Sequence, residues 1–278
     1  GFKEILGEIN DDTICELLKT IYGLVQAALM WYKKIAGILV DKLKFKKNRK
    51  DPCLFYKKDE HGEIVICLYV DDSAMMGDDV ALKKTEADLK EHFTVTCEEL
   101  KKYVGCDYLV TEKGINLHQP KLIQRIKEKF ADELKDLPTK NTPATAGYTV
   151  GEMKEGDQAI TQGEQSKFAS GVGFCGYLVK HSRPEISNAT REHSKQLKGA
   201  NYGHYKNLLR LLKFVVDTEG AMLRMEPSEI LKRLFRLKGV VDTGFATDVD
   251  TRRSVTGYLI YFCDALIAWK SRLQKNVT

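Results

Sequence analysis

The chain has 278 residues, with 44 Lys and Arg against 39 Asp and Glu, so its formal net charge is +5 at pH 7. This length suffices for two modest domains, and an apolar content of 43% is enough for a packed core. No apolar run approaches the roughly eighteen residues that a membrane helix requires, which argues against a membrane partner. The mild basic excess is compatible with a polyanionic partner but does not identify one.

Seven cysteines are spread irregularly along the chain, with no Cys-x-x-Cys pair and no zinc-type spacing. They are Cys15, Cys53, Cys67, Cys97, Cys106, Cys175 and Cys263. The odd number and irregular spacing indicate reduced thiols and an intracellular protein. A cytoplasmic particle and the nucleus both remain open as locations.

In chain order, residues 12–38 are helical in pattern, with Asp11, Asp12 and Thr13 as candidate caps and an interruption at Gly23. Segments 53–56 and 63–76 are typical of strands, and 79–93 of an amphipathic helix. Short strands are expected within 94–117, followed by a helix over 120–137.

Residues 141–163 are polar and contain Pro and Gly, which predicts a linker. Helices are expected again over 164–179 and 185–218, and then strands at 239–246, 254–262 and 266–273. Runs of strands and runs of helices in this order predict an α+β fold.

Two adjacent aspartates, Asp71 and Asp72, separate two apolar runs that predict the arms of a tight hairpin. Aspartate is a common turn residue, so an ordinary solvated turn is one interpretation. Carboxylates held by a rigid hairpin are also suited to binding a divalent metal ion against phosphates.

The sequence Tyr69-Val70-Asp71-Asp72 resembles the catalytic motif of reverse transcriptases. Residues 21–32 read Ile-Tyr-Gly-Leu-Val-Gln-Ala-Ala-Leu-Met-Trp-Tyr, which resembles the Tyr-Gly-Leu-Lys-Gln-Ala-Pro-Arg-x-Trp-Tyr segment of copia-type LTR retrotransposon polymerases. Residues 51–55, Asp-Pro-Cys-Leu-Phe, match a short stretch of the same family.

Three later blocks are similar to that family in the same order. Residues 103–105, Tyr-Val-Gly, resemble its Phe-Leu-Gly turn, and residues 182–186, Ser-Arg-Pro-Glu-Ile, resemble its Thr-Arg-Pro-Asp-Ile. Residues 251–258, Thr-Arg-Arg-Ser-Val-Thr-Gly-Tyr, resemble the opening of its RNase H domain. Six blocks in one order are far more specific than any single block.

The resemblance implies a right-hand polymerase palm, in which helices pack on an antiparallel sheet, followed by a helical thumb and connection. The implied boundaries are partial fingers and palm at 1–118, thumb at 119–140, linker at 141–163, helical connection at 164–236 and a partial RNase H-like unit at 237–278. The implied activity is RNA-directed DNA polymerisation, with an RNA template, a DNA primer, an RNA–DNA hybrid, dNTP and the remainder of a polyprotein as partners.

The resemblance also implies roles for individual residues. Asp71 and Asp72 would bind Mg2+ or Mn2+, and Tyr69 would line the floor of the site beside the primer end. Gln26 would contact the nucleotide and template, since an amide both donates and accepts hydrogen bonds. Tyr103 and Gly105 would lie in the turn that positions the primer strand. Asp242 would be the first metal-binding aspartate of RNase H, although a plain turn aspartate is the alternative.

This copy departs from the family pattern in two ways. Val25 stands where Lys is usual, and Ala28-Leu29 stand where Pro-Arg is usual. A further metal-binding aspartate of the polymerase would fall before Gly1, and the later acids of RNase H after Thr278. We therefore expect a polyprotein fragment that is inactive as an isolated chain. A non-catalytic nucleic-acid-binding remnant is the alternative.

Two basic regions are candidates for phosphate contact. The first is the run Lys42, Lys44, Lys46, Lys47, Arg49 and Lys50, with Phe45 interleaved. The second, between Lys180 and Lys213, includes Arg183, Arg191, Lys195, Lys198, Lys206 and Arg210. Solvated protein faces are the alternative interpretation of both.

Overall fold

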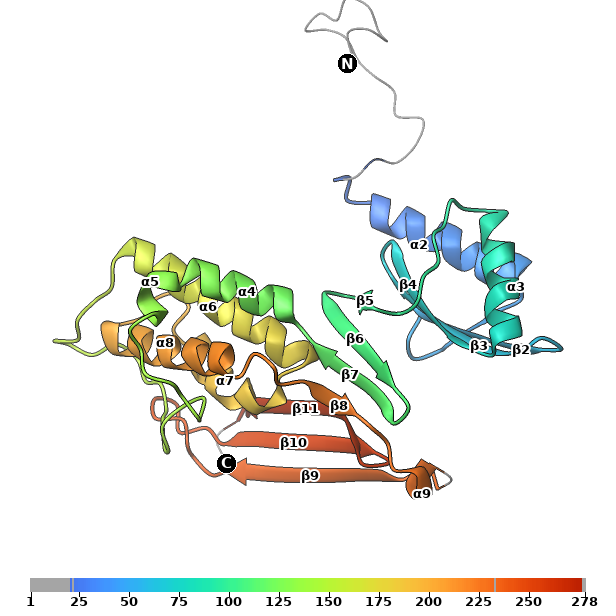
Figure 1. Cartoon of the computed structure of the whole chain (residues 1–278). Helices are drawn as coiled ribbons and strands as arrows, with labels where there is room; N and C mark the ends of the chain where they lie inside the picture. Colours follow the sequence, from blue (N-terminus) through green and yellow to red (C-terminus); the bar gives the residue numbers. More distant parts are fainter. Residues whose placement is uncertain (1–20, 22, 233, 277–278) are drawn as a thin grey trace, which may run out of the picture. The chain divides into compact units, whose positions relative to one another are not determined.

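The computed structural model describes residues 21, 23–232 and 234–276, and the chain divides into two compact units, Gly1–Glu99 and Leu100–Thr278 (Figure 1). Both units combine helices with antiparallel strands, which is compatible with the predicted α+β class. The candidate helix caps at residues 11–13 lie outside the described residues. Within the described part of the chain, no helix has both the length and the apolarity to cross a membrane.

The first unit is built on a four-stranded antiparallel sheet in the order β1-β2-β3-β4. The strands are β1 (Lys46–Lys47), β2 (Leu54–Asp59), β3 (Gly62–Tyr69) and β4 (Asp72–Gly77). The helices of this unit are α2 (Ala27–Gly37), its π-helical continuation η1 (Ile38–Lys42) and α3 (Asp79–Lys90).

The core of the first unit is formed by every second side chain of β3, because these side chains point to the same face of the sheet. Ile64, Ile66 and Leu68 are buried on one face of the sheet and pack with Leu39 of η1 and Leu89 of α3. Successive strand residues point to opposite faces, so Tyr69 and its cross-strand partner belong to the other face. The helices therefore back one face of the sheet and leave the turn between β3 and β4 at its end (Figure 1).

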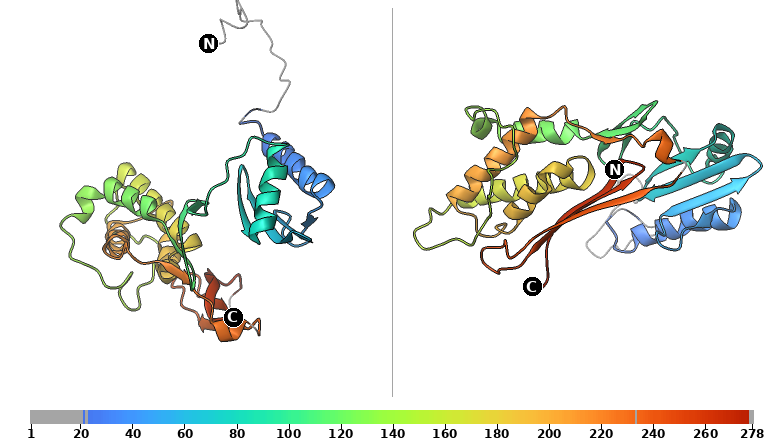
Figure 2. Two further views of the ribbon diagram at one scale, coloured as in Figure 1. Left: turned by 45° about the vertical axis from the view of Figure 1, so that its right-hand side comes forward. Right: turned by 90° about the horizontal axis from the view of Figure 1, so that it is seen from below.

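The second unit contains two further sheets. One has the order β5-β6-β7-β8, from β5 (Lys102–Tyr103), β6 (Cys106–Thr111), β7 (Gly114–His118) and β8 (Leu223–Met225). The other has the order β11-β10-β9, from β9 (Leu237–Gly244), β10 (Val255–Phe262) and β11 (Ala265–Leu273), and Figure 2 shows it from two further directions.

Helices form the main core of the second unit. They are α4 (Pro120–Lys129), α5 (Ala131–Leu134), α6 (Gln162–His181), η2 (Pro184–Ile186), α7 (Ser187–Ser194), α8 (Tyr202–Asp217) and the short α9 (Glu229–Lys232). Ile126, Phe130, Phe168, Leu208 and Leu211 are fully buried among them. The segment from 141 to 161 that precedes α6 has no helix or strand other than an isolated bridge between Ala159 and Asn201.

Arg183 has a structural role that was not predicted from the Ser-Arg-Pro-Glu-Ile block at residues 182–186. Its side chain is 1% exposed and donates to the side-chain and backbone oxygens of Thr218, at the end of α8, and to Glu185. Its guanidinium also lies over the Phe214 ring, 5.7 Å from the centroid. The Ser-Arg-Pro-Glu-Ile block therefore fixes the end of α6 against the end of α8.

Three expectations about elements require correction. The helix expected over 120–137 breaks at Phe130, whose side chain is fully buried and whose φ of −117° is not helical. The helix expected over 185–218 is divided into η2, α7 and α8, with Asn201 capping α8. Strand β8 was not predicted. Its partner β7 lies about a hundred residues earlier in the chain, and the strand propensity of a segment does not indicate which distant segment it pairs with.

Candidate functional site

The adjacent aspartates lie at the tip of the β3–β4 hairpin, as the sequence predicts. Tyr69 pairs with Asp72 across the hairpin, so Val70 and Asp71 form a two-residue turn. Tyr69, Asp71 and Asp72 are all exposed, with Tyr69 50% accessible. The structure thus brings three predicted site residues together at one exposed end of a rigid sheet.

The backbone of this turn is strained. Val70 has φ +53°, a left-handed conformation that a β-branched residue rarely adopts. Strain of this kind persists only where the surroundings determine the conformation, and it concentrates at functional sites.

The restraint on the turn comes from α2 and α3. The Nε1 of Trp31 donates a hydrogen bond to the carbonyl oxygen of Val70 at 2.8 Å. The Trp31 ring in turn packs edge-on against Phe93, just beyond α3, with centroids 5.5 Å apart. The tryptophan of the Tyr-Gly-Leu block therefore fixes the position of the aspartate-bearing turn.

Two exposed neighbouring carboxylates fit part of a Mg2+ or Mn2+ site, because these ions prefer hard oxygen ligands and take one or two carboxylates plus substrate phosphates. Among the described residues, no group of three or more His, Cys, Asp or Glu side chains is arranged to hold a metal ion. Asp71 and Asp72 therefore supply an open, incomplete ligand set within the part that the structure describes.

Gln26 occupies the N-cap position of α2, and its side chain is exposed and forms no cap hydrogen bond. The helix it begins is the one that carries Trp31. Val25, beside it, is 99% exposed and Leu29 is 53% exposed, so two apolar side chains face solvent close to Gln26.

Tyr103 and Gly105 belong to a second strained turn, in the other unit, with Tyr103 before the turn and Gly105 within it. Tyr103 pairs with Cys106, which leaves Val104 (φ +48°) and Gly105 (φ +68°) as the two turn residues. The Tyr177 hydroxyl of α6 donates to the Val104 carbonyl at 3.1 Å. Two observations favour glycine at position 105. Its φ is positive, and a Cβ at this position would lie 2.9 Å from the Tyr177 hydroxyl oxygen.

A cavity of about 580 Å³ adjoins that turn, and its lining is rich in cations. Lys102, Lys121 and Arg125 line it, together with Gln119, whose side chain is 2% exposed. The cavity also contacts Cys106, whose pKa burial raises to about 11, so this thiol stays protonated at neutral pH.

Asp242 lies near the end of β9 opposite Gly257 and is exposed. It borders a groove of about 220 Å³ with Ser187 and Lys270. No described carboxylate cluster completes a metal site around it. Asp242, Tyr103 and Gly105 belong to the second unit, whereas the Asp71 turn belongs to the first.

The first basic run is exposed, as a phosphate-contacting surface requires. Lys46 and Lys47 form β1, and Lys42, Lys44, Arg49 and Lys50 lie around it. The interleaved Phe45 is 2% exposed and belongs to the core, so it is not available for stacking on bases.

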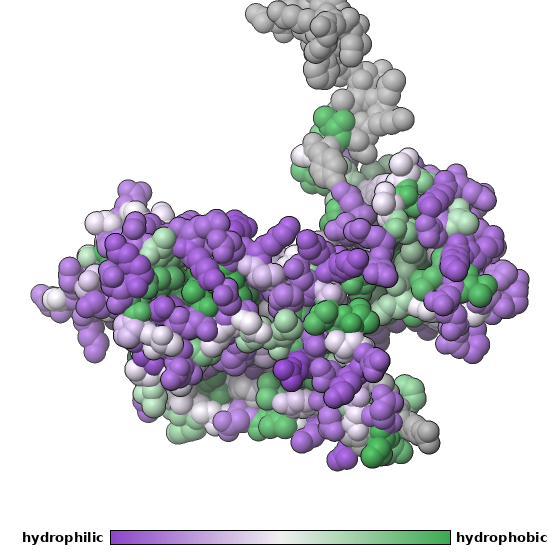
Figure 3. Space-filling view, viewed as in Figure 1, coloured by the Kyte–Doolittle hydropathy of each residue, from purple (hydrophilic) through white to green (hydrophobic). Residues whose placement is uncertain are grey.

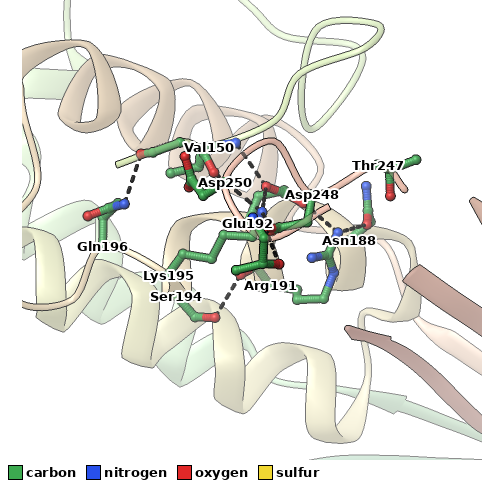
Figure 4. A network of polar contacts seen from close by, with 12 residues as sticks. Val150, Asn188, Arg191, Glu192, Ser194, Lys195, Gln196, Thr247, Asp248 and Asp250 are labelled. Carbon is green, nitrogen blue, oxygen red and sulfur yellow. Dashed lines mark hydrogen bonds and ion pairs between the residues drawn. The ribbon is translucent and has the colours of Figure 1, made fainter. Parts of the chain in front are cut away.

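The second basic region is different, because three of its members are used internally. Besides the buried Arg183, Arg191 and Lys195 of α7 and its end form ion pairs with Glu192, which is 3% exposed (Figure 4). Lys195 also contacts Asp248 at 2.6 Å. These three cations are therefore not available to a nucleic-acid backbone.

The network around Glu192 links three segments that are distant in the sequence, at residues 150–151, 192–196 and 248–251. Glu192 accepts from the Val150 amide at 2.8 Å, Gln196 donates to the Gly151 carbonyl, and Asp248 accepts from Thr251 in the β9–β10 loop. Hydrogen bonds and Lys195 hold the pKa of Asp248 well below its usual range, against the effect of burial. The Asp-x-x-Thr spacing at 248–251 was the available sequence signal for this turn.

Comparison with known proteins gives a family match over a range that includes the hairpin. The family described as "Reverse transcriptase (RNA-dependent DNA polymerase)" matches residues 2–146. The chain is 30% identical over 271 residues to the "Retrovirus-related Pol polyprotein from transposon TNT 1-94" of Nicotiana tabacum, which covers 95% of this chain and 20% of the relative. It is 26% identical over 268 residues to the corresponding polyprotein from transposon RE2 of Arabidopsis thaliana, covering 96% and 18%.

A shorter relative is the "Putative transposon Ty5-1 protein YCL074W" of Saccharomyces cerevisiae, 25% identical over 287 residues, with 98% of this chain and 86% of the relative covered. The chain spans about a fifth of the length of the plant polyproteins that it matches. No solved structure matches it.

Proposed function

The chain belongs to the reverse transcriptase (RNA-dependent DNA polymerase) family, and we propose that it is the polymerase segment of a copia-type retrotransposon polyprotein. The observation that carries the proposal is the exposed Asp71–Asp72 turn at the end of a helix-backed antiparallel sheet, held by Trp31. This arrangement is suited to a polymerase palm.

Within this proposal the parts of the chain have the following roles. Residues 1–118 belong to fingers and palm, 119–140 to the thumb, 141–163 to a linker, 164–236 to the connection and 237–278 to the start of an RNase H-like unit. The partners are an RNA template, a DNA primer, dNTP and the rest of the polyprotein.

Asp71 and Asp72 would hold Mg2+ or Mn2+ from the turn. When bound, such an ion lowers the pKa of an attacking hydroxyl and offsets the charge on a pyrophosphate leaving group. The exposed ring of Tyr69 offers an apolar floor for the primer end, and Gln26 at the start of α2 offers an amide to the nucleotide. The exposed cations around β1 supply sequence-independent phosphate contacts.

The proposal is tested by replacing the matching segment of the tobacco polyprotein with this chain and measuring primer extension with Mg2+. We expect extension that Asp71→Asn abolishes, whereas Asp79→Asn, an exposed aspartate at the start of α3, leaves it unchanged. Extension that survives Asp71→Asn would contradict the assignment of the site.

The isolated chain should not extend a primer, since its described carboxylates form no cluster of three. Mg2+ binding measured by calorimetry should be weak and should disappear in Asp71→Asn. Extension by the isolated chain would mean that another acid completes the site, and Asp11 and Asp12 are the first to replace.

A second candidate is a nucleic-acid-binding remnant without turnover. The exposed Val25 and Leu29 favour it, because they stand where basic side chains would contact phosphates. A replaced polyprotein that binds duplex in a salt-dependent manner but does not extend primers, even after Val25→Lys and Leu29→Arg, would support the remnant and contradict the polymerase.

A further inference from the structure

The cavity of about 580 Å³ beside the β5–β6 turn is built from the interior of the sequence, since all its lining residues lie between 102 and 177. Its walls come from β5 and β6, from the start of α4, which follows β7, and from α6, which packs beside α4 (Figure 1). Figure 3 shows that polar side chains dominate the surface over α4 in that view. A cavity of this volume has the size of a small-molecule site.

The inner wall of the cavity contains a buried hydrogen-bond donor without an acceptor. Gln119 is 2% exposed, and its Oε1 accepts from the Ser182 hydroxyl at 2.8 Å. Its Nε2 is buried, and no described residue accepts a hydrogen bond from it. A buried donor of this kind is costly, and an acceptor atom supplied by a ligand would remove that cost.

The N-terminus of α4 adds a positive potential at the same place. Gln119 is the N-cap of this ten-residue helix, but its side chain forms no cap hydrogen bond. The first N–H groups of a helix have no intrahelical carbonyl partner, and the helix dipole favours negative charge beside them. The cap therefore leaves this end of α4 suited to an anion.

Three cations line the cavity, namely Lys102, Lys121 and Arg125. Lys121 and Arg125 are four positions apart on α4, so they lie on one face of the helix. The ion pairs among described residues all use other cations. The guanidinium of Arg125 lies over the Phe174 ring, 5.5 Å from its centroid, which restrains the group while its N–H donors remain in its own plane.

Little negative charge opposes these cations. Asp107, which pairs with Lys102 across β5 and β6, is the one carboxylate in the lining. The Cys106 thiol also lines the cavity, and burial raises its pKa to about 11, so it carries no charge at neutral pH. The lining is therefore cationic at neutral pH.

We propose that this cavity binds a terminal phosphate group, carried by a free nucleotide or by the 5′ end of a nucleic-acid strand. A helix N-terminus, a guanidinium fork and an amide N–H are all donors that match phosphate oxygens. A terminal phosphate is attached on one side only and can reach the buried Gln119, whereas an internal phosphodiester carries a sugar on both sides. The site goes beyond the polymerase role and does not depend on Asp71.

The ligand is tested with two pairs of probes that differ only in the phosphate. The full chain is titrated with dAMP and with deoxyadenosine by calorimetry. It is also titrated with a 5′-phosphorylated single-stranded oligonucleotide and its 5′-hydroxyl counterpart, both labelled at the 3′ end, by fluorescence anisotropy. We expect the phosphate to strengthen binding by about ten-fold or more in at least one pair. A gain with dAMP alone identifies a free nucleotide, a gain with the oligonucleotide alone identifies a strand end, and no gain in either pair overturns the proposal.

The cations are tested by removing one charge at a time. Lys121→Gln and Arg125→Gln should each reduce the gain from the phosphate by about ten-fold, because each removes a charge-assisted hydrogen bond. Lys135→Gln, an exposed lysine that does not line the cavity, is the matched control and should leave the gain unchanged. A gain that survives in both cavity variants, or that falls equally in the control, would overturn the proposal.

The buried amide is tested by Gln119→Glu, which keeps an acceptor for the Ser182 hydroxyl and places a carboxylate in the cavity. This variant should abolish the gain from the phosphate. Gln124→Glu makes the same change of charge at an exposed position of α4 outside the lining, and should retain the gain. Circular dichroism verifies that each variant is folded, and if Gln119→Glu does not fold, the variants at the exposed Lys121 and Arg125 decide the outcome. A folded Gln119→Glu that keeps the full gain would overturn the proposal.

Discussion

The indole of Trp31 and the carbonyl of Val70 are 2.8 Å apart, and this hydrogen bond joins α2 to the strained turn that carries Asp71. The two residues are 39 positions apart in the chain. Because Val70 has φ +53°, the turn depends on contacts from its surroundings to keep its shape.

Replacing Trp31 with Phe should loosen the turn. Phenylalanine keeps an aromatic contact with Phe93 but cannot donate to Val70, so the free energy of unfolding should fall by about 1 kcal/mol. Denaturant titration measures this decrease, and primer extension in the replaced tobacco polyprotein should fall with it. Trp269→Phe is the matched control, because Trp269 donates to the Val179 carbonyl at 2.7 Å in the other unit. An equal decrease of extension in both variants would show that Trp31 has no special relation to the turn.

Replacing Gly105 with Ala should destabilise the second unit. The substitution places a Cβ at φ +68° and 2.9 Å from the Tyr177 hydroxyl, at a cost of about 1–2 kcal/mol. Gly173→Ala, at an exposed position of α6 with no atom within 4 Å of the new Cβ, should instead stabilise by about 0.5–1 kcal/mol. Thermal unfolding of the two variants provides the comparison. A neutral Gly105→Ala would show that the turn relaxes.

The stability of the second unit should fall as the pH is lowered from 7 to 5. His193 is 1% exposed, and burial lowers its pKa to about 4. The unfolded state therefore takes up the proton first, and the stabilisation present above pH 6.5 is lost as the pH falls towards 4. Down to pH 5 the decrease from this group is about 2 kcal/mol.

His193→Gln should reduce that pH dependence of the unfolding free energy, measured by urea titration at each pH. His181 and His204, whose pKa values burial also lowers, would account for the dependence that remains. The low pKa of Asp248 acts in the same direction only below about pH 4, outside this window. An unchanged slope in His193→Gln would mean that the pKa of this side chain does not differ between the folded and unfolded states.

Binding to duplex should weaken with salt through the cations around β1. Changing Lys46, Lys47 and Arg49 to Gln should reduce the slope of log affinity against log salt by about 0.9 for each phosphate that is no longer neutralised. Lys113, Lys135 and Lys154, which are all exposed in the second unit and lie outside both basic regions, are changed together to Gln as the control with the same change in net charge. Equal effects of the two triple variants would indicate a diffuse charge effect rather than a binding surface.

Local patterns predicted the hairpin well, because the alternation of Ile64, Ile66 and Leu68 and the two aspartates after Tyr69 are signals that neighbouring residues carry. The same reasoning could not find β8 beside β7, or the break at Phe130, since both depend on packing between distant segments. It also treated Arg183, Arg191 and Lys195 as surface cations. Their burial depends on Thr218, Glu192 and Asp248, which a count of basic residues does not associate with them.

The buried ion pairs of Lys195 have a consequence for how copies of a mobile element decay. Replacing Lys195 by an apolar residue would leave the buried carboxylate of Asp248 without its ion pair, which commonly costs about 3–5 kcal/mol. A lesion in this network should therefore strongly destabilise the protein product, whereas lesions at exposed lysines outside the run around β1 should have little effect on its stability. In sister copies of this sequence, intact charges at 192, 195 and 248 beside scattered changes at the surface would record a history of selection for a folded product.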